Sequence, residues 1–275
     1  MPENNARNQV VVTNPAGDPI LSSGDLGFDW RVGPSFLLGY RPTPKDAWEI
    51  SYFGLHDWNA VQNEFSDTTD LQLPGDLGNV ANFFGASEIQ TSYSSRLDNA
   101  EINYFWHYDN PAVMWMAGFR YFHLDERFDI TSTVTGTGSS QYYVRTDNDM
   151  GGGQLGVRLR GGGTRLEWDI TAKAGAYDNS LGQTQSITNA ETVRDPNVGR
   201  HEADWAFIGD IGANVSFNFC RCWCAMAGYQ VMWVDGLALA PNQLDFRNTP
   251  GAGTGLDRGG NVFYQGAHVG VGCRW

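Results

Sequence analysis

Apolar and polar side chains alternate with a period of two along much of the chain, a pattern typical of β-strands with two different faces. The clearest case is the segment 202–220, EADWAFIGDIGANVSFNFC. Its odd positions from Ala203 to Phe219 are apolar or glycine, whereas all its charged residues lie at even positions. The pattern therefore predicts a long strand here, with one apolar and one polar face.

The same alternation recurs elsewhere, so the sequence predicts about nine strands in all. The other predicted strands cover residues 28–41, 47–56, 100–108, 112–126, 154–160, 164–177, 223–234 and 261–275. Tight turns alternate with long polar stretches, which cover about 60–88, 131–146, 178–201 and 240–260. Short turns at one end and long loops at the other predict an all-β fold, an antiparallel up-and-down transmembrane β-barrel.

Alternation alone does not say which face is buried, because a soluble barrel would place its apolar face inside. The spacing of aromatic residues favours a membrane barrel. Trp30 and Tyr40 are ten residues apart, and so are Trp223 and Trp233. Ten residues span roughly 33 Å, which a strand tilt of about 40° reduces to about 25 Å, the height of a barrel's apolar band. We interpret the four residues as parts of two aromatic girdles, with chance placement as the alternative.

Charges of both signs occupy the opposite face in the middle of the predicted strands. An Arg or Lys facing lipid at mid-depth would cost about 2–4 kcal/mol, so these side chains must face a lumen or water. The mixture of signs predicts ion pairs within the lumen. The predicted lumen-lining residues are Arg31, Glu49, Glu101, Arg120, Arg158, Glu167, Asp169, Lys173, Asp210 and His268.

Composition excludes several other classes of protein. The chain has 275 residues and a formal net charge of −13, without a basic stripe that would neutralise nucleic-acid phosphates. No apolar run reaches the roughly 20 residues of a transmembrane helix. The first residues, MPENNARN, lack the basic and apolar regions of an export signal. The sequence predicts no nucleic-acid partner and no cofactor.

The last strand ends in HVGVGCRW, with Trp275 as the final residue. The aromatic end, together with Cys273, Gly270 and His268, looks like the C-terminal signal of bacterial outer-membrane barrels. The resemblance implies the barrel-assembly machinery and outer-membrane lipid as partners. It leaves the oligomeric state open.

Two groups of residues could carry chemistry. Three of the four cysteines, Cys220, Cys222 and Cys224, fall in one tight turn, too close together for a usual structural zinc site, so we predict no metal site. Cys220 and Cys224 share a face and could form a hairpin disulfide, although thiols without a catalytic role are the favoured interpretation.

His123 with Asp125, and Asp147 with Asp149, lie near predicted external strand ends, where a carboxylate–His pair could activate water. Ordinary solvated charge is the favoured interpretation, so we predict no enzyme. The following stretch, DNDMGGGQ (147–154), predicts a bulge or a close backbone approach.

Several stretches resemble a family of outer-membrane β-barrel proteins from planctomycetes that is described as porin-like. They are WEISYFGLHDW (48–58), RLDNAEINYFWHY (96–108), MAGFRYFHLDERF (116–128), GGQLGVRL (152–159), GYQVMWVDGLALAPNQ (228–243) and GGNVFYQGAHVGVGCRW (259–275). The resemblance covers about 28–275. It implies a fold and an outer-membrane location, and no established activity.

In that family, a signal peptide and an aromatic first strand come before a loop like VVVTNPAGDPI (10–20). We therefore expect residues 1–27 to be a loop remnant, residues 28–275 to form the barrel, and one upward strand of a ten-stranded barrel to be missing. The alternative is that residues 8–14 supply a short tenth strand. We expect a narrow charged lumen in a structural or weakly pore-forming barrel. A surface-binding, adhesin-like barrel and an omptin-like hydrolase are the alternatives.

Overall fold

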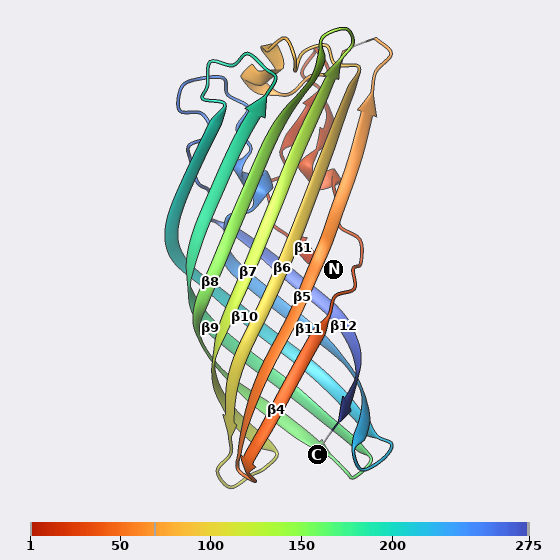
Figure 1. The fold of residues 1–275 in the computed structure, drawn as a ribbon, viewed down its shortest axis with the longest axis vertical. Helices are drawn as coiled ribbons and strands as arrows, with labels where there is room; N and C mark the ends of the chain where they lie inside the picture. The colour runs from red at the N-terminus through yellow and green to blue at the C-terminus, as the bar shows by residue number, and fades with distance from the viewer. Residues whose placement is uncertain (1, 69, 274–275) are drawn as a thin grey trace.

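The computed structural model describes residues 2–68 and 70–273, and nine long antiparallel strands dominate it (Figure 1). The strands curl into a tall, open barrel with short turns at the lower end. They are β4 (Ser35–Thr43), β5 (Asp46–Phe65), β6 (Glu88–Trp106), β7 (Val113–Val134), β8 (Gly138–Gly162), β9 (Leu166–Thr188), β10 (Asn197–Asn218), β11 (Trp223–Leu237) and β12 (Gly260–Cys273).

The strand order follows the chain from β4 to β12, with each long strand antiparallel to its sequence neighbours. The predicted all-β, up-and-down fold is therefore confirmed. A three-residue strand, β1 (Pro2–Asn4), extends the sheet by pairing with the upper part of β12. Among the described residues, no helix is long and apolar enough to cross a membrane.

The strands are longer than the alternation predicted, because in their upper halves the outward face is largely polar and the inward face mixes apolar with polar residues. The predicted loop at 131–146 is wrong: β7 and β8 continue to a turn of three residues, 135–137. Gly136 in this turn has a φ of 85°, in the left-handed region that favours glycine. The polar residues in the upper parts of these strands have the composition of a loop, so the alternating pattern did not predict a strand there.

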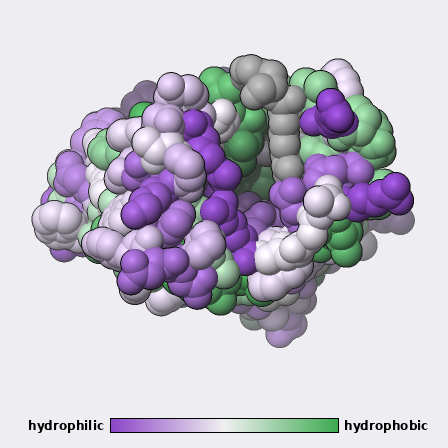
Figure 2. Space-filling view, turned by 90° about the horizontal axis from the view of Figure 1, so that it is seen from below, coloured by the Kyte–Doolittle hydropathy of each residue, from purple (hydrophilic) through white to green (hydrophobic). Residues whose placement is uncertain are grey.

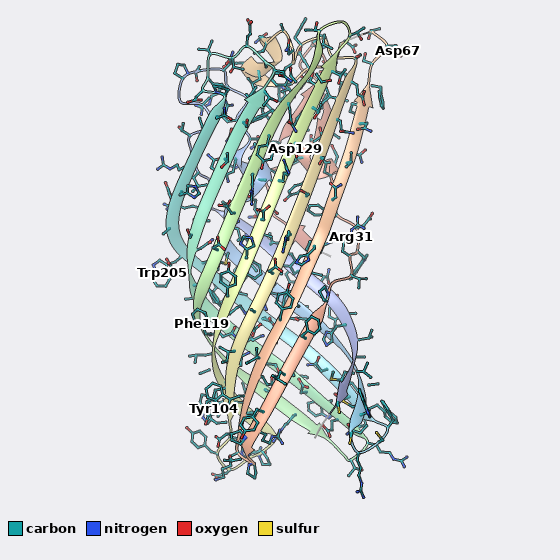
Figure 3. The ribbon with its side chains drawn as sticks, in the orientation of Figure 1. Arg31, Asp67, Tyr104, Phe119, Asp129 and Trp205 are labelled. Carbon is teal, nitrogen blue, oxygen red and sulfur yellow. The ribbon has the colours of Figure 1, made fainter. Side chains whose placement is uncertain are left out.

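The predicted strand 28–41 begins later than expected, at Ser35. Pro34 lacks the backbone N–H that a central ladder position needs, and its carbonyl accepts the last bond, from the N–H of Gly54 at 3.1 Å. Trp30 and Arg31 therefore lie in the coil before β4, which corrects their assignment to a strand. Figure 3 shows Arg31 projecting from this coil at the side of the barrel.

Outward-facing side chains form an apolar band around the lower part of the barrel. Phe119 and Trp205 point away from the wall in Figure 3, and Leu155 is 68% exposed. The upper limit of the band lies at the same height on three neighbouring strands, since Tyr121 lies opposite both Ala100 and Gly151. The next outward positions on these three strands are Asp98, His123 and Asp149. On β6, β7 and β8 the outer surface thus changes from apolar to charged at one common level.

The main hydrophobic core fills the inside of the barrel above that level. It includes Val11 and Val12 from the N-terminal segment, Leu73 and Leu77 from the β5–β6 connection, and Leu239 from the β11–β12 connection. The short elements in these segments are β2 (Val10–Thr13), β3 (Pro19–Ser22), η1 (Ser23–Asp25), η2 (Gly75–Asn79) and η3 (Ala240–Gln243). Because β2 pairs with β3, residues 8–14 do not supply a tenth barrel strand.

The glycine-rich stretch of β8 allows the backbone of this strand to lie close to β9. Its pairings with β7 and β9 show no register shift, so the predicted bulge is absent from these ladders. Gly152 lies opposite Tyr177, where an added Cβ would collide with the Ala176 carbonyl and lie 2.7 Å from the Tyr177 Cα. The stretch therefore provides a close backbone approach.

We expect Gly152→Ala to destabilise the barrel by about 1–3 kcal/mol, because the added methyl group meets backbone atoms that cannot rotate away. Gly153→Ala is the matched control, since its Cβ would come no closer than 4.0 Å to the Gly118 carbonyl. Denaturant unfolding of both variants, refolded in detergent micelles, measures the difference. Equal stability of the two variants would contradict the close approach.

Candidate functional site

Four charged side chains from four strands meet inside the lower half of the barrel. Arg120 of β7 places its Nη2 2.8 Å from Glu101 Oε1 of β6 and 3.0 Å from Asp210 Oδ2 of β10. Lys173 of β9 places its Nζ 2.7 Å from Glu101 Oε2 and 3.6 Å from the same Asp210 oxygen. We call these four residues the charged layer.

The charged layer joins opposite walls of the barrel. Glu101 faces Arg120 across one ladder and Lys173 faces Asp210 across another, so two ion pairs could form between adjacent strands. The Arg120–Asp210 contact instead connects β7 with β10, between which β8 and β9 lie in the sheet. The Arg120 side chain is 0% exposed. This geometry places ion pairs across the interior of the barrel.

Neutral hydrogen bonds complete the surroundings of the two carboxylates. Glu101 Oε2 accepts from Gln154 Nε2 at 2.8 Å and from Asn103 Nδ2 at 2.9 Å. Asp210 Oδ2 accepts from Gln230 Nε2 at 2.7 Å. Buried charges are tolerated when they are paired and hydrogen-bonded, and both carboxylates of the layer meet this requirement, whereas Arg120 Nε has no hydrogen-bond partner in the described part of the chain.

A second set of polar contacts lies nearer the short turns. Arg158 of β8 makes a two-pronged contact with Glu49 of β5, at 2.5 and 2.8 Å, and stacks 4.0 Å from the Phe105 ring centroid. Asn214 donates to Asp169 at 2.9 Å and contacts His268 at 2.7 Å. Glu167 accepts from Asn218 at 3.0 Å. Seen from this end, hydrophilic residues gather beside a central hollow (Figure 2).

The structure thus places nine of the ten residues predicted to line a lumen on strands, and brings all nine into the two sets of contacts with partners on other strands. His268 joins the second set from β12 through Asn214. Arg31 is the exception, because it lies in the exposed coil before β4. The alternating pattern could place charges on one face, but it could not say which of them meet across the lumen.

The upper opening is covered by residues 238–259, which we call the cap loop. Asn148 of β8 bonds to both backbone groups of Ala238: its Oδ1 accepts at 2.8 Å and its Nδ2 donates at 3.0 Å. Gln185 of β9 donates to the Gln243 carbonyl at 2.6 Å. The sequence did not predict these inward polar residues, because the inward positions of the upper strands mix polar with apolar residues and so weaken the alternating signal.

Asp245 organises the middle of the cap loop. Its carbonyl accepts from Arg194 Nη1 at 2.5 Å, and its N–H donates to Tyr142 Oη at 2.9 Å. Burial alone would raise the pKa of Asp245, but hydrogen bonds from the Arg247 side chain and the Gly253 N–H lower it to about 2. The Asp245 carboxylate is therefore charged at neutral pH. Its hydrogen bonds to Arg247 and Gly253 hold this part of the cap loop in place.

Glu126 anchors the start of the cap loop from the barrel wall. It lies above the apolar band, beside the outward charges Asp125 and Arg127. Its Oε2 accepts from the Ala240 N–H at 3.0 Å, and its Oε1 accepts from Tyr93 Oη at 2.8 Å. Burial raises the pKa of Glu126 to about 7, despite these two hydrogen bonds.

Three of the four predicted girdle residues lie on strands, and one does not. Tyr40, Trp223 and Trp233 lie on strands and are exposed, whereas Trp30 lies in the coil. His268, Gly270 and Cys273 of the predicted assembly signal lie on β12, and Trp275 is outside the described residues.

All four cysteines are free, so the hairpin disulfide that the sequence allows between Cys220 and Cys224 is not formed in this structure. Cys220 lies in the exposed turn, whereas Cys224 is buried opposite Asn218, and the hairpin register therefore does not place the two opposite each other.

His123 contacts Asp149, at 2.8 Å from its Nδ1 to Oδ1, and not the Asp125 that follows it in the sequence. Asp125 pairs with Arg145. Tyr121 Oη also donates to Asp149, at 2.7 Å. The His–Asp pair lies on the outer surface of the wall, just above the apolar band.

A family model described as "Putative beta barrel porin-7 (BBP7)" matches residues 2–275. The chain belongs to this family. The porin-like resemblance found in the sequence is thereby confirmed, and the family's description implies a non-enzymatic role in an outer membrane. Comparison with curated proteins finds no match.

We expect Arg120→Leu to destabilise the barrel by about 3–5 kcal/mol, because Glu101 and Asp210 would be left buried without this cation. Arg127→Leu is the control, since Arg127 is half exposed and its pair with Asp129 should contribute less than about 1 kcal/mol. Denaturant unfolding in detergent micelles compares the two variants. A smaller loss in Arg120→Leu than in Arg127→Leu would contradict the role of the layer.

The raised pKa of Glu126 predicts a pH-dependent cap loop. A carboxyl group whose pKa is higher in the folded state disfavours that state once it must ionise, so docking should weaken as pH rises from about 4.5 to about 7. Hydrogen exchange of residues 238–259, corrected for intrinsic rates, should show less protection at pH 8 than at pH 5. Glu126→Gln should remove this dependence, whereas Asp125→Asn should keep it.

Proposed function

We propose that this β-barrel is an outer-membrane protein whose narrow lumen is obstructed twice, by the charged layer below and by the cap loop above. Its role is structural or weakly pore-forming. The observation that carries the proposal is the Arg120 guanidinium, which is fully buried while contacting carboxylates from β6 and β10. Barrels of eight strands are just filled by side chains, and open channels need about 16–18 strands, so nine long strands fit the filled regime.

The apolar band supports the proposed location. Exposed side chains such as Leu155, Trp205 and Ile211 would be costly in water but suit the hydrocarbon of a bilayer. Outer-membrane lipid is therefore one proposed partner. The barrel-assembly machinery is the other, on the strength of the C-terminal sequence pattern.

A second candidate function is binding at the cell surface. Strands β6–β10 continue well above the apolar band, so a large wall with charged outer residues would stand outside the membrane. A pocket of about 320 Å³ opens on this wall, next to the upper limit of the band. Its lining includes Tyr52, Asp98, Tyr121 and His123. The charged wall and this pocket support the surface-binding alternative.

Planar-bilayer recording tests the obstructed lumen. We expect the purified barrel to show small or no steady conductance, because ion pairs occupy the lumen. Arg120→Ser combined with Lys173→Ser should raise the conductance, since both cations of the layer are shortened. Arg127→Ser, on the outer face, is the matched control and should leave it unchanged. A large steady conductance of the unmodified barrel would overturn the proposal.

A further inference from the structure

The short turns at the lower end of the barrel, together with the strand ends beside them, carry a positive charge. We call them the lower rim, which covers residues 41–46, 107–112, 160–165 and 219–222. Five cations stand against two carboxylates there, which gives a formal net charge of +3 on a chain whose total is −13. The cations are Arg41, Lys45, Arg160, Arg165 and Arg221, and the carboxylates are Asp46 and Asp109.

All of the rim cations except Arg160 are exposed and available to an outside partner. In the part of the chain that the structure describes, these four form no ion pair with a carboxylate. Exposed arginines above the apolar band differ, since Arg127 lies 3.0 Å from Asp129. Arg200 likewise lies 2.5 Å from Glu202. The positive charge of the lower rim is therefore not neutralised as it is higher on the wall.

Exposed tryptophans mark the depth of the lower rim in a bilayer. One lies within the first three residues of each strand that runs upward from the rim, and their exposed fractions are 43–50%. They are Trp48 on β5, Trp115 on β7, Trp168 on β9 and Trp223 on β11. Tryptophan is enriched where the hydrocarbon of a bilayer meets its headgroups. The rim cations lie just below this level, at the depth of the headgroups.

A cavity of about 900 Å³ opens on the outer wall between the lower rim and the apolar band. Tyr104, near the lower end in Figure 3, and Trp106 line it with stacked rings whose centroids are 5.6 Å apart. Ala117 lies opposite Tyr104 and contributes only a methyl group, which leaves space in this row of side chains. Lys45 lines the same cavity and supplies a cation from the rim.

The carboxylate of Asp46 also lines this cavity, but hydroxyl groups of the wall already bind it. Its Oδ1 accepts from Tyr104 Oη at 2.7 Å, and its Oδ2 accepts from Thr43 Oγ1 at 2.6 Å. The cavity thus combines apolar surface for a hydrocarbon chain with the unpaired ammonium group of Lys45 for an anion.

We propose that the lower rim binds anionic phospholipids, with the headgroup phosphate against the rim cations and the adjoining acyl chain in the cavity over Ala117. The inference rests on the proposed membrane location, and it adds the charge class of the lipid and the end of the barrel that holds it. Charge complementarity carries it. A phosphodiester offers acceptor oxygens to the unpaired Lys and Arg donors, whereas a zwitterionic headgroup brings a cation of its own next to them.

Lipid competition tests the lower rim. The whole barrel in detergent micelles is mixed with equal amounts of phosphatidylglycerol and phosphatidylcholine that have the same acyl chains. After washing, mass spectrometry quantifies the lipids that each barrel retains. The test variant combines Lys45→Gln with Arg165→Gln. The matched control combines Arg127→Gln with Arg200→Gln, and so loses the same charge above the apolar band.

We expect the unmodified barrel and the control to retain phosphatidylglycerol in preference, and the test variant to lose about fivefold of this preference for each cation removed. A wash in about 1 M salt should abolish the preference, because the charges are then screened within about 3 Å. Inorganic phosphate should not displace the lipid, since it has no acyl chain for the cavity.

Equal preference in the test and control variants would overturn the inference, and so would displacement of the lipid by inorganic phosphate. Reconstitution into vesicles separates this failure from failure of the proposed function. A barrel that inserts into vesicles of both lipids without a preference would contradict the lower rim alone. Insertion into neither would overturn the membrane location and the inference together.

Discussion

The contact of one arginine with carboxylates on two different walls organises the lower half of this barrel. A guanidinium group offers several donors in a fixed plane, so Arg120 can bind Glu101 beside it and Asp210 across the lumen at the same time. Lys173 then neutralises the remaining charge. Gly152 of β8 lies opposite both Arg120 of β7 and Tyr177 of β9, and its missing side chain leaves room along the wall for Tyr177.

The outward-facing residues of the same strands form two regions, a lower one that suits lipid and an upper one that suits water. On β7 the outward residues up to Tyr121 are apolar, and those from His123 to Thr133 are charged or polar. The inside changes at a similar height, from ion pairs to a hydrophobic core closed by the cap loop. Strands β6–β10 are 19–25 residues long and extend through both regions without interruption.

The lower half of the fold could be predicted from the sequence, because lipid on one side and charge on the other force a strict alternation. The segment 202–220 illustrates this, since the observed strand is Asn197–Asn218. The upper half could not, because its outward residues are largely polar and its inward residues mix a hydrophobic core with polar side chains such as Asn148 and Gln185, which have the composition of a loop. Pairings also escaped prediction: His123 contacts Asp149 and not Asp125, since cross-strand register is absent from a linear pattern.

The charged layer contains two cations and two anions, so it carries no formal net charge although the chain as a whole carries −13. A balanced layer produces little long-range field along the lumen, in contrast to a ring of like charges. Any solute small enough to reach it would therefore be sorted by its size and by its ability to exchange hydrogen bonds, and hardly at all by the sign of its charge.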